Sequence, residues 1–127
     1  MAKKKPKKKA KKSVRSRSTK GLPTNHKLGR YENVVFEFHN SNDSREFRGT
    51  VVIREDAMVL EIPKQDRYAE SLVVGQPQTH FFRGSNSSRA PDALSCDARW
   101  ADLGDLFAGT WQDDDYDSLF TFRLPKR

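Results

Sequence analysis

Few side chains in this chain could carry out nucleophilic or acid–base catalysis. Cys96 is the only cysteine, and beyond residue 27 the histidines are His39 and His80. A cysteine nucleophile needs a nearby base to remove its proton, and nothing in the sixteen-residue spacing of His80 and Cys96 forces the two to meet. A lone cysteine more often packs as a small apolar side chain. These side chains also lack zinc-ligand spacing, so we expect no metal site. Together these observations lead us to expect neither enzymatic activity nor a cofactor.

A run of alternating carboxylates lies near the C-terminus. Asp113, Asp115 and Asp117 resemble the opening of a calcium loop, but the glycine and glutamate that follow in such loops are replaced by Ser118 and Leu124. We therefore interpret the run as the solvated turn of a hairpin. A second hypothesis is that these aspartates attract the basic N-terminus of the same chain and hold it until a polyanion displaces it.

Basic and acidic residues are separated along the chain. Residues 1–27 carry ten lysines and two arginines with no acidic residue, whereas the remaining hundred carry 12 basic and 17 acidic residues. The two parts therefore have charges of +12 and −5, which together give the net +7 of the whole chain. A basic tail on an acidic body predicts a polyanionic partner that is reached through the tail.

The basic segment has the composition expected for binding to a phosphate backbone. A lysine ammonium neutralises a phosphate without a fixed geometry and releases condensed counterions, so such binding is independent of nucleotide sequence. The residues expected to contact DNA or RNA are Lys3, Lys4, Lys5, Lys7, Lys8, Lys9, Lys11, Lys12, Arg15, Arg17 and Lys20.

Two stretches of this segment resemble known tails. Residues 3–12 resemble histone-type tails and nuclear-localisation segments, and residues 15–18 resemble the arginine-serine segments of RNA-associated proteins. The resemblance implies nucleic-acid contact, with a nuclear address or a solubilising tail as the alternatives. Residues 1–27 have too few large apolar side chains to offset the entropy of ordering, so we expect them to form a disordered arm.

The composition also bears on the cellular compartment. A single cysteine excludes an intramolecular disulfide, and the N-terminal charges are not followed by the apolar stretch of a secretory signal. No apolar run approaches the roughly 18 residues that cross a bilayer, so we expect no membrane insertion. The expected location is the cytoplasm or the nucleoid, or the nucleus in a eukaryote.

Beyond Leu28, apolar and polar residues alternate in short segments separated by turn formers, which predicts strands that bury one face. We expect strands near 34–38, 47–53, 58–62, 68–74, 79–83, 106–112 and 118–124, with Gly49 at a bulge or close approach. Residues 91–103 are ambiguous because Pro91 and Gly104 suit the ends of a helix. The alternation from Leu94 to Trp100 favours a strand.

Residues 28–127 are therefore predicted to form a single acidic all-β domain, a small antiparallel meander barrel or sandwich of seven to eight strands. Residues 108–111 resemble the Gly-x-Trp segments of lipocalin- and avidin-type barrels, and we expect Trp100 and Trp111 to close the ends of the core. Residues 80–83 could present rings and arginine to single strands, as oligonucleotide-binding barrels do. The favoured interpretation is that one of the two phenylalanines belongs to the core and the other is partly exposed.

These observations predict a non-enzymatic, nucleic-acid-associated protein. Its arm contacts phosphates without sequence preference, and its β domain supplies attachment to a protein partner or modest recognition. The alternative is a protein-protein interaction or small-ligand-binding barrel whose tail serves solubility or localisation.

Overall fold

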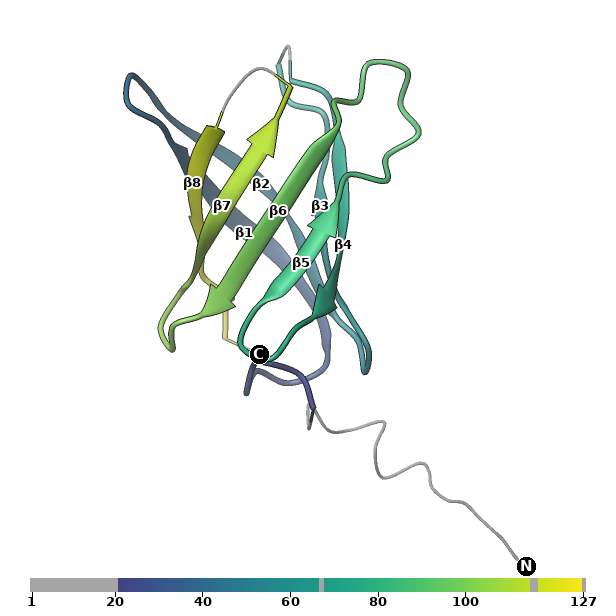
Figure 1. The fold of residues 1–127 in the computed structure, drawn as a ribbon, viewed down its shortest axis with the longest axis vertical. Helices are drawn as coiled ribbons and strands as arrows, with labels where there is room; N and C mark the ends of the chain where they lie inside the picture. Colours follow the sequence, from purple (N-terminus) through teal and green to yellow (C-terminus); the bar gives the residue numbers. More distant parts are fainter. Residues whose placement is uncertain (1–20, 67, 115–116, 127) are drawn as a thin grey trace, which may run out of the picture.

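Short alternating segments fold into eight antiparallel strands that close into a barrel (Figure 1). The computed structural model describes residues 21–66, 68–114 and 117–126. The strands are β1 (Gly29–His39), β2 (Ser44–Ile53), β3 (Met58–Ile62), β4 (Ser71–Pro77), β5 (Phe82–Ser85), β6 (Cys96–Asp102), β7 (Phe107–Asp113) and β8 (Asp117–Phe122). The predicted all-β class is confirmed, and the described residues contain no helix that could cross a membrane.

The closure of the barrel decides between the two predicted architectures. Each strand pairs antiparallel with the next strand along the chain, and β1 also pairs with β8, where Phe36 lies opposite Phe122 and Phe38 opposite Phe120. This last ladder joins the first and last strands, so the molecule is a closed up-and-down barrel rather than two packed sheets.

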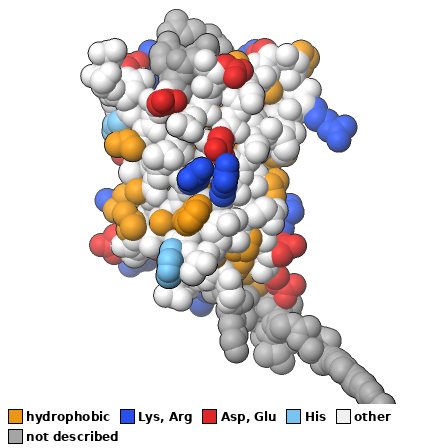
Figure 2. Space-filling model, in the orientation of Figure 1, with side chains coloured by type: hydrophobic (Ala, Val, Ile, Leu, Met, Phe, Trp, Pro, Cys, Tyr) orange, Lys and Arg blue, Asp and Glu red, His pale blue; other side chains and the backbone are white. Residues whose placement is uncertain are grey.

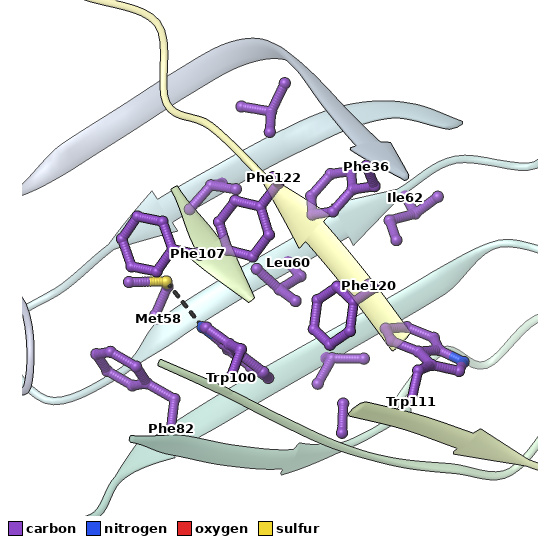
Figure 3. Close-up of a cluster of buried hydrophobic side chains, with 14 of the residues drawn as sticks. Phe36, Met58, Leu60, Ile62, Phe82, Trp100, Phe107, Trp111, Phe120 and Phe122 are labelled. Atoms are coloured by element: carbon purple, nitrogen blue, oxygen red, sulfur yellow. Dashed lines mark hydrogen bonds between the residues drawn. The ribbon is translucent and has the colours of Figure 1, made fainter. Parts of the chain in front are cut away.

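Inward-facing side chains fill most of the interior. In a strand every second side chain points to the same face, so the apolar members of each alternating segment meet inside. Figure 3 shows these side chains, of which the largest are aromatic. The fully buried aromatic residues are Phe36, Phe82, Trp100, Phe107, Phe120 and Phe122. An eight-stranded barrel is just wide enough for side chains to fill it, as they do here.

Glycines make room where two strands or a large ring come close. A Cβ on Gly49 would lie 2.2 Å from the carbonyl oxygen of Glu61, so the predicted close approach at Gly49 is confirmed. A Cβ on Gly75 would lie 2.4 Å from the indole of Trp100. That indole is buried, and its Nε1–H donates to Sδ of Met58 over 3.1 Å (Figure 3).

The predicted strands in the middle of the chain are displaced. Strands expected at 68–74 and 79–83 are observed as β4 and β5, about three residues later. A turn closed by backbone hydrogen bonds between Gln65 and Tyr68 occupies the start of the first segment, so β4 begins later in the sequence. The ambiguous segment 91–103 contains β6, as the alternation favoured.

Residues 22–26, which the charge pattern placed in the arm, pack against one end of the barrel. Leu22 contacts the core cluster, and Thr24 is buried. Its Oγ1 donates to Oδ2 of Asp102 over 2.8 Å, and the ring of His26 lies 5.2 Å from that of Phe107. This N-terminal strap, residues 22–26, anchors the start of the described chain at the lower end of the barrel in Figure 1.

Candidate functional site

A cup opens at the end of the barrel opposite the N-terminal strap. It has a volume of about 980 Å³ and lies at the mouth formed by the β1–β2 turn, the segments that follow β3 and β5, the end of β7 and the start of β8. Strand β6 runs from the cup to the strap. Cys96 at its start lines the cup, and Asp102 at its end contacts the strap. The β1–β2 turn and the loop between β5 and β6, which border the cup, lie at the upper end of the barrel in Figure 1.

Four aromatic rings from three parts of the chain line the cup in a row. Trp111 lies 5.1 Å from Phe38, Phe38 lies 5.5 Å from Phe47, and Phe47 lies 5.2 Å from Tyr68, measured between ring centroids. Successive rings are nearly perpendicular, an edge-to-face arrangement that the ring quadrupoles favour. We call these four residues the aromatic row. Three of them, from Phe38 to Tyr68, are only partly buried and can contact a ligand.

One cation already lies against the aromatic row. The guanidinium carbon of Arg45 is 5.2 Å from the centroid of Tyr68, and its Nη2 is 2.6 Å from Oδ2 of Asp43. The electron-rich face of a ring attracts a cation within about 6 Å, and the carboxylate adds direct charge pairing. The cup therefore contains one example of a cation held between a ring and a carboxylate.

The polar lining of the cup is mostly acidic. Four aspartates line it, Asp43, Asp92, Asp113 and Asp117, whereas Arg45 is the single lysine or arginine among the described lining residues. Lys64 pairs with Asp92 over 3.3 Å from outside the lining. A concave site with an excess of carboxylates repels phosphates and attracts cations, because the low-dielectric walls concentrate its field.

The cysteine and the histidines do not assemble into a catalytic pair. Cys96 lines the cup and is buried, and this burial raises the pKa of its thiol to about 12, so the nucleophilic thiolate does not form near neutral pH. His80 is exposed at the other end of the barrel, where it lines a second cavity of about 500 Å³ beside the strap. His39 is also exposed, and its Nδ1 lies 3.1 Å from Oγ of Ser44.

Metal ligands do not gather anywhere in the described part of the chain. Within residues 21–66, 68–114 and 117–126 no group of three histidine, cysteine or acidic side chains could hold an ion. Asp115, the middle member of the alternating aspartates, lies outside the described residues.

The structure does not describe the residues that are predicted to bind nucleic acid. All eleven, from Lys3 to Lys20, lie outside the described residues. Of the possible single-strand platform, Phe82 is fully buried and Phe81 is partly buried, which confirms the interpretation of one core ring. Arg83 on β5 lies opposite Arg99 on β6 but pairs with Asp97. Figure 2 shows basic and acidic side chains interspersed on this face of the molecule.

Most residues of the cup carry no functional signal in the sequence. Trp111 was expected at an end of the core, and it does line the cup, whereas Trp100 lies in the interior. Arg45 and Tyr68 were not identified, because their proximity depends on how the barrel closes. One signal was present in the sequence: in an up-and-down meander, alternate turns lie at the same end, so residues 40–43 and 63–70 share a mouth.

Comparisons with known protein families, curated proteins and solved structures found no significant match to this chain.

Proposed function

We propose that this protein is a non-enzymatic binding protein that associates with DNA or RNA through its N-terminal lysines and arginines. The observation that supports the proposal is the separation of charge along the chain. The described residues from 21 onward hold 11 basic and 16 acidic side chains, so this part would not attract phosphates by its net charge. The eleven basic residues from Lys3 to Lys20 have no acidic neighbours in sequence.

Such binding is independent of nucleotide sequence and depends strongly on salt. For duplex DNA, each neutralised phosphate contributes about −0.9 to the slope of log K against log salt, so six engaged side chains give a slope of about −5. We place this activity in the cytoplasm or on the nucleoid, or in the nucleus of a eukaryote, because it requires access to nucleic acid.

Fluorescence anisotropy with a labelled duplex, measured from 50 to 200 mM salt, tests this proposal. Replacing the eight lysines between residues 3 and 12 by glutamine should weaken binding by more than about tenfold and reduce the salt slope by at least half. The matched control is Arg83→Gln with Arg99→Gln, which removes exposed charge from the barrel and should have little effect. Undiminished binding by the lysine variant would move the site to the barrel.

A second candidate function is that of a ligand-binding or protein-binding barrel, and the cup favours it. Its volume lies within the usual range for small-molecule sites, and it combines apolar rings with a few polar groups. The excess of carboxylates favours a cation. Benzyltrimethylammonium and benzenesulfonate share an aromatic body and differ in charge, so tryptophan fluorescence should respond to the first probe and not to the second. Equal responses would contradict a charge-selective cup.

A further inference from the structure

We propose that the cup binds lysine side chains of the chain's own basic segment, residues 3–12, so that the cup and nucleic acid compete for them. The competition rests on the proposed nucleic-acid function, whereas the contact between segment and cup does not. This hypothesis extends the expected attraction between the C-terminal aspartates and the basic N-terminus to a defined concave site.

The aromatic row offers two places for a cation, one at each end. At one end Arg45 lies between the ring of Tyr68 and the carboxylate of Asp43. At the other end Trp111 lies on the same face of β7 as Asp113, a carboxylate of the lining. Asp117 also borders the cup, at the start of the neighbouring strand β8, but it lies opposite Gln112 and therefore on the outer face of the barrel. This second place has the same chemistry as the first, a ring together with carboxylate.

The chemistry of the second place fits a lysine better than it fits other ligands. A lysine has a flexible apolar stem that can cover the rings while its ammonium reaches the carboxylates. A phosphate or a carboxylate ligand would meet four aspartates. Residues 3–12 contain eight lysines, so many registers of the segment place an ammonium in the cup.

The basic segment is long enough to reach the cup from the other end of the barrel. Strand β6 spans the distance from the strap to the cup, and its six residue steps from Asp102 to Cys96 correspond to about 20 Å. Lys12 is nine residues before Gly21, a stretch that extends to about 30 Å, and Lys3 reaches about twice as far. Attachment in the same chain gives an effective concentration on the order of millimolar, which compensates for weak individual contacts.

The two tryptophans supply a direct test by NMR on the full chain. Trp111 lies in the cup and Trp100 lies in the interior, so their indole N–H signals report on binding and on fold respectively. Replacing the eight lysines between residues 3 and 12 by glutamine should shift the Trp111 signal and leave that of Trp100 in place. Raising the salt from 50 to 500 mM should move the wild-type Trp111 signal towards that of the variant. An identical Trp111 signal in the two proteins at low salt refutes the contact.

Dilution separates the chain's own segment from that of another copy. A contact within one chain gives the same Trp111 shift at 20 and 500 μM protein, whereas a shift that disappears on dilution would assign the contact to a neighbouring molecule and overturn the proposal.

Variants of the cup test the competition. If the segment occupies the cup three quarters of the time, its affinity for nucleic acid is lowered about fourfold. Asp113→Asn with Asp117→Asn should therefore tighten duplex binding more than the control, Asp56→Asn with Asp105→Asn, which makes the same charge change at the other end. Equal affinities of the two variants would refute the competition. If the wild type does not bind the duplex, the proposed function is refuted, but the contact between the basic segment and the cup is not.

Discussion

Two neighbouring residues on β8 test the register of the barrel with opposite expected results. Phe120 is fully buried and lies within 6.1 Å, between ring centroids, of Phe38, Trp100, Trp111 and Phe122. Removing a buried phenylalanine side chain costs about 3–5 kcal/mol of unfolding free energy, through lost burial and the cavity left behind. The four ring contacts place Phe120→Ala at the upper end of that range, because each aromatic pair adds about 0.5–1.5 kcal/mol.

The control is the preceding residue, Leu119, which is 61% exposed on the outer face. Leu119→Ala should change stability by no more than about 0.5 kcal/mol. Urea unfolding followed by far-ultraviolet circular dichroism measures both changes from the midpoint at a constant m-value. A larger loss for Leu119→Ala than for Phe120→Ala would mean that β8 is paired one residue out of register, since such a slip exchanges its inner and outer faces.

Three further changes probe other parts of the barrel. Gly109→Ala should cost about 3 kcal/mol in urea unfolding, because the new Cβ would lie 1.7 Å from the carbonyl oxygen of Arg99; a neutral effect would contradict this close contact. Thr24→Val should cost about 1 kcal/mol by removing the hydrogen bond to Asp102, and faster amide exchange in the strap should accompany it. Burial raises the pKa of Cys96 from 9.0 to about 12, so between pH 9 and 12 the thiol ionises in the unfolded protein but not in the folded protein. Stability should therefore fall as the pH rises from 9 to 12, and a parallel decline in Cys96→Ala would refute that origin.

The strands were largely predictable because alternation reports directly which side chains are buried. Val34 and Phe36, or Phe120 and Phe122, are spaced by two residues and all face the core. The positions of β4 and β5 were less well predicted, because the turn at 65–68 depends on contacts that the pattern does not contain. One such contact is the pair of hydrogen bonds between the side chain of Gln65 and the backbone of Arg48.

The cup could be predicted only in part. Phe38, Phe47 and Trp111 are recognisable as inward-facing residues of separate strands, whereas Tyr68 lies between β3 and β4 and carries no such signal. The assembly of the four rings into one row requires the barrel to close and the register of each ladder to be known. Arg45 illustrates the difficulty, since in sequence it is one of several arginines near a turn. Only the folded chain brings it over Tyr68, which is 23 residues away.

The attachment of the strap also could not be deduced from charge. Residues 22–26 follow the basic run and look like its continuation, yet Leu22 and Thr24 contact the barrel. The carboxylate of Asp102, which accepts the hydrogen bond from Thr24, is 78 residues away, and no local pattern connects two such positions.

The ladder between β1 and β8 has a consequence for how the barrel forms. Seven of the eight ladders in the described chain join strands that follow one another, so hairpins can assemble quickly from local contacts. The eighth brings together Phe36 and Phe122, 86 residues apart, and must overcome a much larger loop entropy. We expect it to form last on the folding pathway. Until it does, β1 and β8 expose unpaired edges to other chains, so slow closure would be the step most vulnerable to aggregation.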